Sequence, residues 1–109
     1  MKTYQHYING SHVEPDSGVY FDTESPYTGK VGARIARGHT GDADRAVKAA
    51  KDAFDTGDWP AMRPTERGKL LVKLAEIIEG ESVRLGELEV QDNGKLIACL
   101  LYTSDAADE

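Results

Sequence analysis

The run Pro64-Thr65-Glu66-Arg67-Gly68-Lys69-Leu70-Leu71 opens the stretch that decides the fold, and this stretch closes on Asp92-Asn93-Gly94-Lys95. Its apolar residues recur at helical spacing and form one wide stripe, composed of Leu70, Leu71, Leu74, Ala75, Ile77 and Ile78. A stripe of this width predicts a helix that contacts more than one neighbour. Thr65 is the predicted N-cap, Glu66 suits the positive end of the helix dipole, and Gly80 is the predicted stop.

Two more helices are predicted, one on each side of this one. Downstream, a helix from about Glu81 to Gln91 ends at Asn93-Gly94, because both residues tolerate the left-handed conformation of a helix C-terminus. Upstream, a helix begins at the predicted N-cap Thr40 and ends at Thr56-Gly57-Asp58, where Gly57 is able to take the left-handed C-terminal position. The apolar stripe of the upstream helix consists of Ala43, Ala46, Val47, Ala50 and Phe54.

The residues before these helices have the patterns of short strands. Asn9-Gly10 is the preferred pair for a two-residue type I′ turn, so Tyr4 to Val13 is predicted to form a β-hairpin. Strands are also predicted at Val19 to Thr23 and at Lys30 to Ala36, where a Pro- and Gly-containing turn joins them into a second hairpin or a meander. Such ribbons are marginal in water, so this part needs a surface to pack against.

Composition and charge exclude several classes of protein. The chain is 39% hydrophobic and 29% charged, as in a globular protein, with a net charge of −6. Acids are interspersed with the bases, which argues against a nucleic-acid partner. There is no run of 18 apolar residues and the start of the chain lacks the apolar core of a secretory signal, so no membrane partner is expected and the predicted location is cytoplasmic.

Several segments, taken in order and spacing, resemble one family. They are Tyr7-Ile8-Asn9-Gly10, Ser25-Pro26-Tyr27-Thr28-Gly29, the run from Ala46 to Phe54, Trp59, Glu66-Arg67-Gly68 and Asp92-Asn93-Gly94-Lys95. Together they resemble the N-terminal segment of the NAD(P)-dependent aldehyde dehydrogenase superfamily, from about Tyr4 to Ile97. Ser25 stands where the family usually has Asn, and Leu96 where it often has Pro, so the resemblance assigns the superfamily and no subfamily.

The resemblance implies an α/β parent enzyme with a Rossmann-like cofactor domain, a catalytic domain and a small β oligomerisation element. This chain would be an α+β piece, with N-terminal β-hairpins followed by three helices from the edge of the cofactor domain. Residues 1–98 would be the incomplete N-terminal part of that domain. The family oxidises an aldehyde to a carboxylic acid with NAD or NADP, through a cysteine thiohemiacetal and a thioester. The parent would take an aldehyde substrate and form a homo-oligomer.

The resemblance assigns none of the residues of this chain to a catalytic site, none to a cofactor-binding site and none to a metal site. The family's catalytic asparagine and cysteine, its general-base glutamate and its cofactor-binding lysine and glycine turn all lie further along than Glu109. No cofactor is therefore expected to bind this fragment, and the fragment itself is expected to be inactive. In many relatives a monovalent cation sits near the corner that corresponds to Thr23 to Pro26, but its other ligands also lie beyond the end.

The last eleven residues, Cys99 to Glu109, continue none of the family's patterns. They resemble the translation of a transposase-type sequencing adapter, TGT CTC TTA TAC ACA TCT GAC GCT GCC GAC, which predicts a non-native or disordered tail. The competing interpretation is a genuine acidic tail. Three acids and no base lie in this segment, so residues 1–98 carry a charge of about −3.

Other residues that invite a functional interpretation have simpler structural ones. Cys99 has no base or cation beside it to activate the thiol. The histidines His6, His12 and His39 lack ligand spacing and are expected to be solvated, while Trp59 is expected to cover core. The glycines Gly29, Gly32 and Gly38 lack the spacing of a phosphate-binding loop. The acids Asp42, Asp44, Asp52, Asp55 and Asp58 are expected to form a solvated helix face and cap region.

Two other functions remain as alternatives. One is a free-standing protein-interaction module that binds through the wide stripe of the Pro64 helix. The other is a small hydrolase, which is discounted because no nucleophile, base and orienting acid can be assembled.

Overall fold

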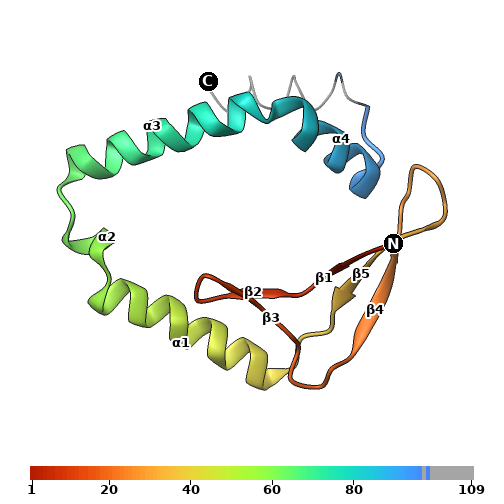
Figure 1. The fold of residues 1–109 in the computed structure, drawn as a ribbon, viewed down its shortest axis with the longest axis horizontal. Helices are drawn as coiled ribbons and strands as arrows, with labels where there is room; N and C mark the ends of the chain where they lie inside the picture. Colours follow the sequence, from red (N-terminus) through yellow and green to blue (C-terminus); the bar gives the residue numbers. More distant parts are fainter. Residues whose placement is uncertain (97, 99–109) are drawn as a thin grey trace.

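The computed structural model describes residues 1–96 and 98. In this part the strands precede the helices, as the sequence predicts (Figure 1). The strands are β1 (Lys2–Tyr4), β2 (His6–Ile8), β3 (Ser11–Val13), β4 (Tyr20–Glu24) and β5 (Val31–Ala36). The helices are α1 (Thr40–Thr56), the short α2 (Asp58–Ala61), α3 (Pro64–Gly80) and α4 (Ser82–Asn93). The α+β class and the three long helices are confirmed, and α2 was not predicted.

The predicted hairpin at Asn9-Gly10 is confirmed. Strands β2 and β3 pair antiparallel, with Tyr7 opposite His12. Asn9 and Gly10 have φ of 53° and 75°, which is the left-handed pair that a type I′ turn requires.

The second set of strands is a three-stranded sheet in the order β1-β5-β4. Strands β4 and β5 are antiparallel, and their turn is closed by Gly29 N–H, which donates to Ser25 O at 2.7 Å. This confirms the predicted second hairpin. Strand β1 pairs parallel with the other edge of β5 and was not predicted, because Lys2–Tyr4 has no alternating pattern and becomes a strand only through that pairing.

The predicted N-caps are each wrong. The N-cap of α1 is His39, whose backbone N–H donates to Asp42 Oδ2 at 3.0 Å, and Thr40 is already helical. The N-cap of α3 is Arg63, one residue before Pro64, whose missing N–H and fixed φ suit the first helical position. In both helices the acid at the third helical position, Asp42 or Glu66, receives the N-cap N–H.

The helix ends follow glycines for two different reasons. Helix α4 ends at Gly94, which has φ of 73° and donates to Val90 O, so the left-handed stop predicted there is confirmed. Helix α3 ends at Gly80, also as predicted. Gly57 after α1 has φ of −77°, so the left-handed prediction is wrong. A Cβ at Gly57 would lie 2.2 Å from Ala53 O, so this glycine is required by the close approach of its own helix.

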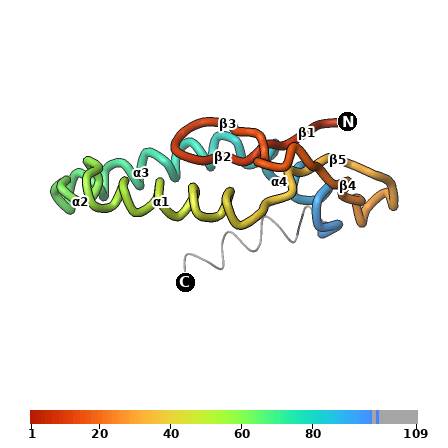
Figure 2. The backbone as a smooth tube through the Cα atoms, turned by 90° about the horizontal axis from the view of Figure 1, so that it is seen from below, coloured from red at the N-terminus to blue at the C-terminus, as the bar shows by residue number. Residues whose placement is uncertain are grey.

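The elements form an open, flat arc. In Figure 1 the chain passes from the strands through α1, α2 and α3 and returns with α4 to the β4–β5 turn, and Figure 2 shows how thin this arrangement is. The radius of gyration of the chain is 17.4 Å, whereas a compact domain of this length has about 13 Å. The chain therefore lacks the compactness of an independent domain.

Little of the apolar surface is covered in the described part of the chain. Ala36 is its one buried hydrophobic residue, while Leu74 and Ile77 on α3 are 51% and 56% exposed. Helix α3 packs mainly against α4, so the expected contact with several neighbours is not met among residues 1–96 and 98. Trp59 is 46% exposed and does not cover a core here. Among the described residues, no helix combines the length and apolar character needed to cross a membrane.

Candidate functional site

The most organised polar group in the structure surrounds Asp42 in the first turn of α1. Its carboxylate accepts the backbone N–H of His39 and of Asp16, both at 3.0 Å, and Nη2 of Arg45 at 2.7 Å. Asp42 is 3% exposed, so the prediction that it lies on a solvated face is wrong. The reason is tertiary: the Pro15–Gly18 turn folds over the start of α1 and covers the carboxylate.

These donors fix the charge of Asp42. The backbone N–H of His39 holds the pKa of the Asp42 carboxyl below its ordinary value, and Asp16 N–H and Arg45 act in the same direction against the opposing effect of burial. Arg45 Nη2 also lies 2.7 Å from Asp16 Oδ1, so one guanidinium is shared by two carboxylates. Asp42 is thus an ionised structural acid rather than a general acid.

His6 completes this group, which we call the Asp42 cluster: His6, Asp16, Asp42 and Arg45. The Nε2 atom of His6 is buried, has no hydrogen-bond partner among the described residues, and lies 3.8 Å from Asp42 Oδ2. The prediction of a solvated histidine is therefore wrong for His6. It is confirmed for His12 and His39, whose residues are exposed.

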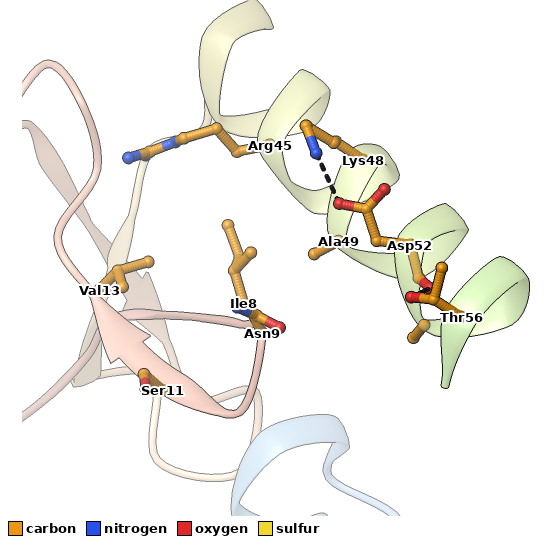
Figure 3. A pocket seen from close by; sticks show the side chains of 10 residues that line it. Ile8, Asn9, Ser11, Val13, Arg45, Lys48, Ala49, Asp52 and Thr56 are labelled. Carbon is orange, nitrogen blue, oxygen red and sulfur yellow. Dashed lines mark hydrogen bonds and ion pairs between the residues drawn. The ribbon is translucent and has the colours of Figure 1, made fainter. Parts of the chain in front are cut away.

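An open hollow of about 630 Å³ lies between the β2–β3 hairpin and α1 (Figure 3). Ile8 and Val13 line it from the hairpin, and Arg45 and Lys48 from the helix. The ammonium of Lys48 is paired with Asp52 and the guanidinium of Arg45 with Asp42. Both cations along this wall are already compensated, so the hollow does not offer a prepared anion site.

A second polar contact joins the β4–β5 turn to the end of α4. Ser25 is 9% exposed, and its hydroxyl donates to Gln91 O at 2.7 Å. Gly94 packs on Pro26, since a Cβ at Gly94 would lie 3.4 Å from Pro26 Cγ. Ser25, noted in the sequence as a departure from the family pattern, thus fastens two segments far apart in the chain.

Arg67 of the Glu66-Arg67-Gly68 motif ties the α2–α3 corner together. Its Nη1 donates to Met62 O at 3.1 Å and reaches Trp59 O at 3.5 Å. Sequence reasoning missed this role. The available signal was the pair Pro60 and Pro64, which bracket a short turn whose carbonyls need donors from a side chain.

The other candidates are turn and cap residues. Gly29 has φ of 67° in the β4–β5 turn, and Lys95 N–H donates to Asn93 Oδ1 at 2.8 Å, which supports the helix-stop interpretation of Asp92 to Lys95. Cys99 lies outside the described residues. Within residues 1–96 and 98, no three His, Cys, Asp or Glu side chains are grouped as metal ligands would be. The expectation that this chain holds no catalytic, cofactor or metal residue stays a prediction.

The architecture is shared with solved aldehyde dehydrogenases. An NAD-dependent aldehyde dehydrogenase from Sinorhizobium meliloti matches with a TM-score of 0.82 and 35% identity, over 90% of this chain and 20% of that one. A point mutant of betaine aldehyde dehydrogenase from Staphylococcus aureus, solved with NAD+, matches with a TM-score of 0.86 and 32% identity, over 93% of this chain and 21% of that one. The strands and helices described above are therefore the N-terminal part of the aldehyde dehydrogenase fold.

The chain belongs to the aldehyde dehydrogenase family, whose sequence model matches residues 12–106. Arabidopsis thaliana aldehyde dehydrogenase family 2 member B4, mitochondrial, is 48% identical over 88 residues, which are 81% of this chain and 16% of that protein. The putative aldehyde dehydrogenase DhaS of Bacillus subtilis is 44% identical over 91 residues, 84% of this chain and 18% of that protein. The chain thus spans no more than about a fifth of these relatives.

The family match also bears on the tail. It runs past Ala98 to Ala106, so the junction predicted at Cys99 is not marked by an end of the match. A non-native tail stays a prediction.

Proposed function

We propose that this chain is scaffold from an enzyme that oxidises an aldehyde to a carboxylic acid with NAD or NADP. In that enzyme a cysteine thiolate attacks the aldehyde, the thiohemiacetal passes hydride to the nicotinamide, and the resulting thioester is hydrolysed. The thiolate, the general base and the cofactor contacts come from parts of the enzyme that follow these 109 residues. By itself the fragment is inactive and binds neither NAD nor NADP.

The observation that carries this proposal is the combination of a family fold with an uncovered interior. Leu70, Leu74 and Ile77 remain about half exposed along α3, where an independent domain would bury them. The relatives are about five times as long as this chain, because the matched residues are 16–20% of their length, so they have polypeptide available to cover these faces. We assign that cover to the Rossmann-like sheet of the parent, with residues 1–98 at the edge of the cofactor domain.

The polar clusters support the same conclusion because each one fastens elements to one another. The Asp42 cluster joins α1 to the turn before β4, Ser25 joins the β4–β5 turn to α4, and Arg67 closes the α2–α3 corner. Family membership gives no support to a free-standing interaction module. A homo-oligomeric, cytoplasmic parent and a non-native tail from Cys99 onward complete the proposal.

Two experiments test it. The purified 109-residue chain, incubated with NAD or NADP and a panel of aldehydes, should form no NADH or NADPH. Turnover that persists after further purification would refute the proposal that the catalytic site is absent from this chain. Sequencing the source DNA should show a reading frame that leaves this sequence near codon 98 and continues to a cysteine and a glutamate in family context. A natural frame that encodes Cys99 to Glu109 and continues from there would sink the adapter origin of the tail but not the family assignment.

A further inference from the structure

The β2–β3 hairpin depends on a few contacts with α1. Each strand has three residues, and a two-stranded ribbon is at best marginally stable in water. In the described part of the chain, its main contact with a helix is that of β2 with α1. Whatever holds His6, the first residue of β2, against the start of α1 therefore decides how firmly the whole ribbon is seated.

We propose that His6 makes a pH-sensitive contact: in its protonated form it pairs with Asp42 and holds the β2–β3 hairpin against the start of α1. The proposal concerns this chain's own residues and does not depend on the enzyme's chemistry. Its basis is the geometry of the Asp42 cluster.

The charges of the cluster are incomplete without a cation on His6. Asp16 and Asp42 contribute two negative charges, and Arg45, shared between them at 2.7 Å from each, contributes one positive charge. The remaining negative charge faces the buried Nε2 of His6. Protonation of the imidazole brings the cluster to neutrality beside the buried Asp42 carboxylate, while the Asp16 and Arg45 side chains on its outer side stay about half exposed.

The distance also suits a switch. Nε2 lies 3.8 Å from Asp42 Oδ2, which is too long for an N–H···O hydrogen bond but within the range of an ion pair. A movement of about 1 Å brings the two atoms to hydrogen-bond distance. Gly38 lies beside the ring, since its missing Cβ would be 3.6 Å from His6 Cε1, in ordinary contact.

Only one partner of this pair changes charge near neutrality. Histidine is the side chain that titrates between pH 5 and 8, whereas the donors around Asp42 keep that carboxylate ionised throughout this range. The pairing of His6 with Asp42 is therefore present at mildly acidic pH and lost as the pH rises.

The other titratable groups near His6 can be named and controlled. His39, in the segment that leads into α1, lines a second open hollow together with His6 and Asp42. Glu14, near the end of the hairpin, accepts a hydrogen bond from Gln5. His12 lies on β3, where its ring meets Tyr7 edge-on at 5.0 Å. His12 and His39 are exposed, and His39→Gln keeps the backbone N–H that Asp42 accepts, so both serve as controls for the buried contact.

The test is amide hydrogen exchange of the β2–β3 hairpin in the full 109-residue chain between pH 5.5 and 7.5, corrected for intrinsic rates. Protection should be roughly two- to fivefold higher at the lower pH, the effect of one partly exposed ion pair. The difference should vanish in His6→Gln and persist in His12→Gln and His39→Gln. A difference that survives in His6→Gln, or one that His39→Gln abolishes, would overturn the proposal.

A second measurement covers the possibility that His6→Gln unseats the hairpin at every pH. In the unmodified chain, the ring nitrogen shifts of His6 report its protonation directly by NMR. Their midpoint should coincide with the midpoint of hairpin protection. Hairpin protection that stays constant across the protonation midpoint of His6, or that changes with the protonation of His39 instead, would equally overturn the proposal.

Discussion

Replacement of Gly57 by Ala tests the finding that this glycine is required by close approach and not by a left-handed turn. The new Cβ would lie 2.2 Å from Ala53 O, which is well under 3.0 Å, the shortest contact that Cβ atoms normally make. Because that oxygen accepts the Gly57 N–H at 3.0 Å, relief of the clash must lengthen or break the bond. The lost hydrogen bond and the residual strain together cost about 1–2 kcal/mol, which is a roughly 5- to 30-fold change in an opening equilibrium.

The assay is amide hydrogen exchange over the last turn of α1, which reports local opening even where the chain does not unfold in one step. Gly57→Ala should lower protection there by roughly 5- to 30-fold. Gly68→Ala in α3 is the control, since apart from the backbone of α3 itself no described atom lies within 4 Å of its Cβ position. Because Ala favours a helix interior over Gly by about 0.5–1 kcal/mol, this control should raise protection in α3 by roughly two- to fivefold. Equal effects of the two substitutions, or an unchanged last turn of α1, would refute the reasoning.

Three further outcomes are expected from the same chain. Protection of the Asp16 and His39 amides should fall as the pH drops below 3.8, the ordinary pKa of an Asp side chain. Because the pKa of Asp42 is lowered in the folded chain, its ionised carboxylate stabilises the fold above pH 3.8, and this stability is lost as the folded carboxylate becomes protonated. An Asp42→Asn chain that keeps the same acid transition would contradict this. Ser25→Ala should leave Gln91 O without its donor and weaken the docking of α4 by about 1–2 kcal/mol, which would be measured as faster proteolysis near the C-terminal end of α4. Replacement of the exposed Ser82 by Ala should leave the proteolysis rate unchanged. Leu74→Gln should change thermal stability by less than about 0.5 kcal/mol, since Leu74 is half exposed; a loss typical of a buried leucine, about 2–5 kcal/mol, would show that α3 is covered in solution.

Local patterns predicted the elements that local interactions form. Asn9-Gly10 specified its own turn, and the left-handed stop at Gly94 could be predicted because nothing distant overrides it. The N-caps failed by a small register error, since the acids three residues further on were assigned to the helix dipole rather than to the cap. Strand β1 was not predicted at all, because its partner β5 lies far along the chain.

Burial was the least predictable property. Asp42 was expected on the surface, and it is buried because a turn from another part of the chain supplies Asp16 N–H. The stripe on α3 was expected to contact more than one neighbour, and among the described residues it stays about half exposed because α3 packs mainly against α4. Sequence periodicity shows that a face is apolar, but it does not show whether the partner of that face is present.

The parallel pairing of β1 with β5 has a consequence for the order of folding. Lys2 meets Ala33 across roughly thirty residues, whereas β4 and β5 close a loop of only a few residues. Two doublings of loop length add about 1.2 kcal/mol of closure entropy, so the pairing of β1 should follow both hairpins. Of the three strands of this sheet, the one that comes first along the chain is then the last to pair, and pulse-labelled exchange should show Thr3 and Tyr4 protected only after Phe21 and Ile35.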